Sequence, residues 1–149
     1  MSGDLRDLYQ EVIFDHYKRP RNMGTLEEAS HRAEGYNPLC GDRVTTYLKV
    51  EDGVVRDAAF EGAGCAIATA SASLMTEALK GRRLDEVEAL FRGFHEMVTD
   101  APATGSPALG KLEVLGGVRE FPARVKCATL AWHTLNAALA KRQQPVSTE

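Results

Sequence analysis

The chain has 149 residues, of which 44% are hydrophobic and 26% charged, and its net charge is −3 at pH 7. These values are typical of one globular domain that can form a core without disulfides. The acidic balance and the lack of a basic stripe speak against nucleic acid as a partner. No apolar run approaches the ~20 residues needed to cross a bilayer, and the polar N-terminus does not resemble a signal peptide. We therefore expect a cytoplasmic protein that contacts neither nucleic acid nor membrane.

The first half of the chain predicts a helix followed by an antiparallel hairpin. Apolar residues at three- and four-residue steps predict the helix over residues 5–18. Alternating apolar and polar side chains predict strands over residues 44–50 and 54–60, which the turn at Asp52-Gly53 joins. Residues 25–41 are rich in turn formers and are expected to be irregular, apart from a third strand that their last part can supply.

The second half predicts mainly helices. Alanine-rich and amphipathic stretches alternate here with clusters of glycine and proline, which end helices or form loops. We expect one domain over residues 1–142 and no internal repeat. The predicted elements are helices over residues 66–79, 84–98, 111–115 and 122–141, a loop over residues 99–110, and a disordered tail over residues 143–149.

Three cysteines and one aspartate are the residues most suited to chemistry. Cys40 and Asp42 flank Gly41, Cys65 follows a glycine-bearing turn, and Cys127 lies near the start of the last predicted helix. The odd number of cysteines argues against a closed disulfide framework. Three thiolates and one carboxylate form a four-ligand set that suits a tetrahedral metal ion such as Zn²⁺.

The cysteine spacing leaves other interpretations open. Reduced cysteines also serve as buried small hydrophobic residues or as reactive thiols, and no zinc-finger spacing is present. Cys65 and Cys127 lie near predicted helix N-termini, where the helix dipole favours the thiolate. Asp42 would be the hardest and weakest ligand of the set, and therefore the easiest to displace. We interpret His16 and His31 as hydrogen-bonded surface or boundary histidines.

Several motifs along the chain belong to one pattern. They are Leu8-Tyr9, Asp15-His16-Tyr17, Pro20-Arg21-Asn22, Asn37-Pro38 with Cys40-Gly41-Asp42, Gly64-Cys65-Ala66-Ile67, and Arg124-Val125-Lys126-Cys127-Ala128-Thr129-Leu130-Ala131-Trp132. Through these motifs the sequence resembles, over residues 5–140, the U-type iron–sulfur cluster assembly proteins, the family of IscU and the N-terminal part of NifU. IscU-like proteins carry a histidine before the third cysteine. Lys126 occupies this position here, which points to the SufU branch.

The resemblance implies a fold and a ligand set. The implied fold is an α+β sandwich in which helices pack on one face of an antiparallel sheet of about three strands. Matched position by position, the metal ligands of the family fall on Cys40, Asp42, Cys65 and Cys127. The implied cofactor is Zn²⁺, and the alternative is iron or a [2Fe–2S] cluster.

The resemblance also implies a function in iron–sulfur cluster assembly. We expect a zinc-dependent sulfurtransferase, rather than a free-standing enzyme, that accepts persulfide sulfur through Cys40 from a SufS-like cysteine desulfurase. A partner histidine would replace Cys40 at zinc, and the sulfur would pass to a downstream cluster-assembly complex. Lys126 and Arg124 are predicted to lower the thiolate pKa or to steer the persulfide, or else to be solvated cations. The alternatives are a scaffold for a [2Fe–2S] cluster and a structural zinc interaction module.

Overall fold

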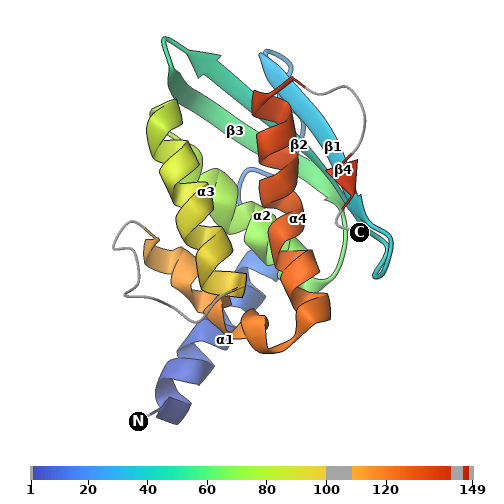
Figure 1. The fold of residues 1–149 in the computed structure, drawn as a ribbon, viewed down its shortest axis with the longest axis vertical. Helices are drawn as coiled ribbons and strands as arrows, with labels where there is room; N and C mark the ends of the chain where they lie inside the picture. Colours follow the sequence, from blue (N-terminus) through green and yellow to red (C-terminus); the bar gives the residue numbers. More distant parts are fainter. Residues whose placement is uncertain (1, 100–108, 142–145, 148–149) are drawn as a thin grey trace.

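The protein is an α+β domain with its helices on one face of a sheet. The computed structural model describes residues 2–99, 109–141 and 146–147. The helices and strands have the α+β arrangement predicted from the sequence, which confirms that prediction (Figure 1). In chain order the elements are α1 (Ser2–Lys18), β1 (His31–Asn37), β2 (Asp42–Glu51), β3 (Val54–Ala63), α2 (Ala66–Leu79), α3 (Leu84–Thr99), the 3-10 helix η1 (Gly110–Glu120), α4 (Pro122–Leu139) and β4 (Val146–Ser147).

The sheet has the strand order β3-β2-β1-β4. Strands β1, β2 and β3 pair antiparallel, and β4 pairs parallel with β1. The β2–β3 turn holds Asp52 and Gly53 at φ angles of 54° and 74°, the left-handed pair that a tight hairpin turn needs. The core face of β2 carries the buried residues Val44, Thr46 and Leu48, as their alternation predicts.

Helices α2 and α4 lie directly on the sheet, and the other helices form an outer layer (Figure 1). Helix α4 contacts β1 and β2, while α2 contacts β3. Trp132 of α4 is 1% exposed and stacks on Phe94 of α3 with ring centroids 4.4 Å apart. This aromatic pair fixes α3 against α4. None of the helices in the described ranges is long and apolar enough to cross a lipid bilayer.

Strand β1 lies within the stretch predicted to be mainly irregular. Its seven residues alternate between buried and exposed, and the buried ones are Ala33, Gly35 and Asn37. Alanine has a small side chain, glycine has none and asparagine is polar, so the alternation of burial produces little hydrophobic pattern in the sequence. The third strand that the sequence left open is thus present, and the prediction of an irregular stretch is wrong for residues 31–37.

The helix predicted over residues 111–115 is longer in the structure. The 3-10 helix η1 runs from Gly110 to Glu120 and passes through Gly116 and Gly117, which were expected to end it. Leu112 and Leu115 are buried in its interior-facing side, and a Cβ at Gly116 would lie only 3.5 Å from Met97 of α3. Burial of Leu112 and Leu115 and the packing of Gly116 on α3 therefore outweigh the flexibility of the glycines.

The predicted loop and tail fall largely outside the described residues. The residues outside the description are 100–108 of the loop and 142–145, 148 and 149 of the C-terminal segment. Within the segment predicted to be disordered, Val146 and Ser147 instead form β4, which pairs with Gly35 and Tyr36 of β1. The edge of β1 offers free backbone groups, and this pairing satisfies some of them. The sequence shows no pattern for so short a strand.

Candidate metal centre

Cys40 and Asp42 lie on the turn that connects β1 to β2. The amides of Cys40 and Gly41 both donate hydrogen bonds to the Asn37 carbonyl, at 3.3 Å and 2.8 Å. Gly41 has a φ of 76°, which a residue with a side chain rarely adopts. The turn leaves Cys40 exposed, whereas Asp42, the first residue of β2, is 1% exposed.

Cys65 joins the end of β3 to the start of α2. It is the N-cap residue of α2, and its Sγ accepts a hydrogen bond from the Ala68 amide at 3.4 Å. Its own amide donates to Asp42 Oδ1 at 2.9 Å. Cys65 remains exposed, yet these bonds attach it to Asp42 and to the helix. The predicted position at a helix N-terminus is confirmed for this cysteine.

Cys127 approaches the same point from α4. Its side chain is 3% exposed, and its Sγ lies 3.7 Å from Cys40 Sγ. One ligand atom each from Cys40, Asp42 and Cys127 lies within 4.8 Å of the others. Cys65 is outside this group of three but borders it, since its Sγ lies 3.9 Å from Asp42 Oδ2. The structure thus brings all four predicted ligands to one end of the sheet.

Two distances among these atoms are close to those of a tetrahedral zinc site. With Zn–S bonds of about 2.3 Å and Zn–O bonds of about 2.0 Å, two sulfurs should lie about 3.8 Å apart, and a sulfur and an oxygen about 3.5 Å apart. The Cys40–Cys127 distance is 3.7 Å and the Cys65–Asp42 distance is 3.9 Å. The donor types fit zinc, and Cys40, Asp42 and Cys127 are grouped closely enough to share one ion, whereas Cys65 would have to move closer to complete a tetrahedral site.

Burial controls the protonation of Cys127. Desolvation raises the pKa of its thiol far above the ordinary value, and contacts with Asp42, Cys65 and Cys40 raise this pKa further. Cys127 lies in the second turn of α4, beyond the first turn where the helix dipole acts. The expectation that the helix start favours its thiolate is therefore wrong. A metal ion that binds Cys127 has to displace a proton.

The two basic residues Arg124 and Lys126 precede Cys127 on α4. Arg124 is exposed and lies over the Phe121 ring at 4.6 Å from the centroid. Lys126 is half-buried. Among the hydrogen bonds of the described residues, neither cation reaches one of the three cysteines. Their predicted roles stay predictions.

From the sequence alone Asn37 is a turn former within the motif that contains Cys40 and Asp42. In the structure Asn37 is 1% exposed, and its Nδ2 lies 3.3 Å from Asp42 Oδ2 and 3.6 Å from Cys127 Sγ. Its place in the motif with Cys40 and Asp42 was the only signal in the sequence. The contact with Cys127, ninety residues away, arises from the packing of α4 on β1.

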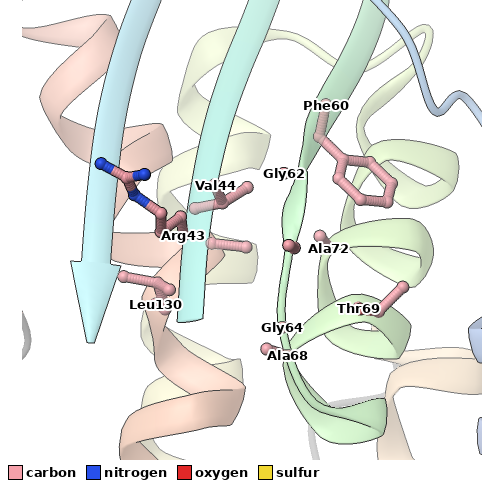
Figure 2. A pocket seen from close by; sticks show the side chains of 11 residues that line it. Arg43, Val44, Phe60, Gly62, Gly64, Ala68, Thr69, Ala72 and Leu130 are labelled. Atoms are coloured by element: carbon pink, nitrogen blue, oxygen red, sulfur yellow. The ribbon is translucent and has the colours of Figure 1, made fainter. Parts of the chain in front are cut away.

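A small crevice lies beside the cluster, between the sheet and helices α2 and α4 (Figure 2). Gly64 and Ala68 line it next to Cys65, and Phe60 and Leu130 line its apolar part. Arg43 is the only ionisable residue in its lining. The crevice therefore offers apolar surface and little chemistry, and the reactive groups belong to the cluster of cysteines and Asp42.

The fold and the cluster define a class of small α+β protein with three cysteines and one aspartate at one end of its sheet, a donor set that could hold a metal ion. The family model for the NifU-like N terminal domain matches residues 8–147. The chain belongs to this family.

The relatives of the chain cover almost its whole length. The zinc-dependent sulfurtransferase SufU of Bacillus subtilis is 44% identical over 142 residues, which are 95% of this chain and 96% of the relative. The iron–sulfur cluster assembly scaffold protein IscU of Thermotoga maritima is 43% identical over 138 residues, covering 93% and 96%. The crystal structure of a putative iron–sulfur cluster assembly scaffold protein for the SUF system, from Fervidobacterium islandicum AW-1, aligns with a TM-score of 0.80 at 35% identity, covering 87% and 94%. The resemblance found in the sequence is thereby confirmed.

Proposed function

We propose that this protein is a zinc-dependent sulfur acceptor in iron–sulfur cluster assembly. It takes persulfide sulfur from a SufS-like cysteine desulfurase onto Cys40 and passes it to a downstream cluster-assembly complex. The proposed zinc ligands are Cys40, Asp42, Cys65 and Cys127. A cytoplasmic location suits the three free thiols, because the cytosol keeps thiols reduced.

One observation carries the choice of Cys40 as the acceptor. Cys127 is buried, and Cys65 is tied to the start of α2 by the hydrogen bond to its Sγ. Cys40 is exposed on a turn whose Gly41 takes a left-handed conformation. Of the three sulfurs, that of Cys40 can move towards a partner with the least disturbance of the fold.

The burial of Asp42 changes which ligand is expected to leave the zinc ion first. On chemical grounds Asp42 is the weakest ligand. However, its Oδ1 accepts from the Cys65 amide and its Oδ2 from Asn37, and the side chain is buried. Moving Asp42 would break both hydrogen bonds, so burial favours Cys40 as the leaving ligand.

The reaction transfers one sulfur atom without net oxidation. A bound zinc ion would supply the positive charge that keeps the cysteines as thiolates. The Cys40 thiolate attacks the outer sulfur of the persulfide on the desulfurase. The sulfur–sulfur bond of the donor breaks, a new one forms on Cys40, and the donor cysteine leaves as a thiolate. We further propose that Arg124 and Lys126, placed beside Cys127 on α4, attract the anionic persulfide.

Intact mass tests the proposal. Zinc-loaded protein is incubated with a cysteine desulfurase and cysteine, and we expect the mass to increase by one sulfur atom. The Cys40→Ala variant should gain no sulfur while its circular dichroism spectrum stays that of the wild type. Wild-type protein stripped of zinc by a chelator serves as the matched control and should also gain none. Sulfur uptake that persists in Cys40→Ala would refute the mechanism.

A scaffold function is the second candidate, because three thiolates also suit a [2Fe–2S] cluster and the Thermotoga maritima relative is named a scaffold. Anaerobic reconstitution with iron and sulfide separates the two functions. A stable cluster that transfers to an apo-protein, together with no sulfur gain in the mass experiment, would favour the scaffold. A purely structural zinc site is disfavoured by the exposed Cys40, because structural sites are closed.

A further inference from the structure

Asn37 connects the proposed ligands to each other and to the turn that carries Cys40. Its backbone carbonyl accepts hydrogen bonds from the Cys40 and Gly41 amides, and its Oδ1 accepts one from the Leu39 amide at 3.3 Å. Its Nδ2 lies within reach of Asp42 and Cys127. A single buried residue thus stabilises the turn through its acceptors and contacts two ligands through its donor.

Burial divides the ligand set into two halves, and the Asn37 side chain contacts only one of them. Asp42 is 1% and Cys127 3% exposed, whereas Cys40 and Cys65 are exposed. The amide group of Asn37 lies 3.3 Å from the carboxylate of Asp42 and 3.6 Å from the sulfur of Cys127. The buried half therefore has a shared hydrogen-bond donor.

We propose that Asn37 is a positioning residue that holds Asp42 and Cys127 in place, so that the site stays intact when Cys40 leaves it. This inference rests on the proposed function for the departure of Cys40. The hydrogen bonds from Nδ2 orient the carboxylate and the sulfur before any ligand exchange. Residues that hold metal ligands in this way are known to affect metal affinity about 10- to 100-fold.

The donor and acceptor functions of Asn37 can be separated. In Asn37→Asp the side chain keeps an oxygen that can accept from the Leu39 amide, so the turn keeps its hydrogen bond. The second oxygen replaces the Nδ2 donor and brings a negative charge next to the Asp42 carboxylate and the Cys127 sulfur. In Asn37→Ala both functions are lost. A role confined to the turn predicts that the aspartate variant behaves like the wild type.

The test measures zinc affinity by competition with a chromogenic chelator. We expect Asn37→Ala to bind zinc about 10- to 100-fold more weakly, and Asn37→Asp at least as weakly. With Co²⁺ in place of zinc, the thiolate-to-metal absorption bands of both variants should shift, because the sulfur and the carboxylate change position. Asn136→Ala is the matched control, since Asn136 is an exposed asparagine of α4 and should retain the wild-type affinity and spectrum.

Three results would overturn the proposal. The first is that Asn37→Ala binds zinc as tightly as the wild type. The second is that Asn37→Asp has the zinc affinity and the cobalt spectrum of the wild type. The third is that the loss of zinc affinity is matched by an equal loss of stability in the metal-free variants. The last result would make Asn37 a general stabiliser of the fold, and thermal unfolding of the metal-free proteins detects it. Metal affinity is measured without a desulfurase, so a failure of the sulfur-transfer mechanism is recognised separately, by the mass experiment on the wild type.

Discussion

Replacing Gly35 with alanine should disturb the contact that places Cys127 next to Asn37. Gly35 lies on the core face of β1, where α4 crosses the strand. A Cβ at this position would collide with Thr134 Oγ1 and would lie 3.2 Å from Leu130 Cδ1. Because Thr134 is completely buried and its hydroxyl donates to the Leu130 carbonyl, the methyl group can be accommodated only if the Thr134 side chain rotates or α4 moves away from the sheet.

The expected cost follows from the type of contact. Overpacking a closely packed core typically lowers the free energy of unfolding by about 1–3 kcal/mol. For a domain of this size each kcal/mol corresponds to about 2–4 °C in melting temperature. Movement of α4 also displaces Cys127, so zinc affinity should fall together with stability.

A double-mutant cycle with Thr134→Ala tests the cause. This substitution removes the colliding hydroxyl and one hydrogen bond to the Leu130 carbonyl, at a cost of about 0.5–1.5 kcal/mol. The Gly35→Ala/Thr134→Ala variant should recover much of the loss, with a favourable coupling energy of about 0.5–3 kcal/mol. Urea unfolding of the metal-free proteins measures all four corners of the cycle.

The control is Gly117→Ala, because a Cβ at Gly117 meets no atom within 4 Å. Its free energy of unfolding should change little or rise slightly, by up to about 1 kcal/mol. Strictly additive effects of Gly35→Ala and Thr134→Ala would refute the collision as the cause, as would a Gly35→Ala protein as stable as the wild type.

Two further predictions concern pH and the metal site. Burial lowers the pKa of His16, so the unfolded chain binds this proton near pH 6.5 and the folded chain only at lower pH. Stability is therefore full above the unfolded pKa and falls as the pH drops below it, by up to about 1.4 kcal/mol per pH unit and histidine. Between pH 7.5 and 5.5, metal-free His16→Gln should lose less free energy of unfolding than the wild type, as measured by urea unfolding. The loss that remains includes the contributions of His31 and His133, whose pKa values burial also lowers. A loss equal to that of the wild type would contradict the assignment to His16. In Gly64→Ala the new Cβ would lie 2.9 Å from Asp42 Oδ1. Chelator competition should then show weaker zinc binding with the fold retained, and unchanged affinity would mean that the carboxylate moves freely.

Local patterns in the sequence determined the hairpin and most of the helices. The alternation from Val44 to Leu48 and the Asp52-Gly53 turn report on neighbouring residues, and the structure confirms both. The four predicted metal ligands could also be listed, because thiols and a carboxylate beside glycines are visible without knowing the fold. The strands, the turn and the helices depend on interactions within a few residues of the chain, whereas the ligands were recognised by residue type and motif.

Tertiary structure decided what depends on distant contacts. The predicted surface or boundary histidine His16 is in fact 1% exposed, with its Nδ1 2.7 Å from Ser73 Oγ of α2. The division of the ligands into a buried and an exposed half, and the contact of Asn37 with Cys127, arise only when α4 packs on β1. Burial and hydrogen bonding between residues far apart in the chain leave no periodic trace in the sequence, and the proposed choice of Cys40 as the leaving ligand rests on them.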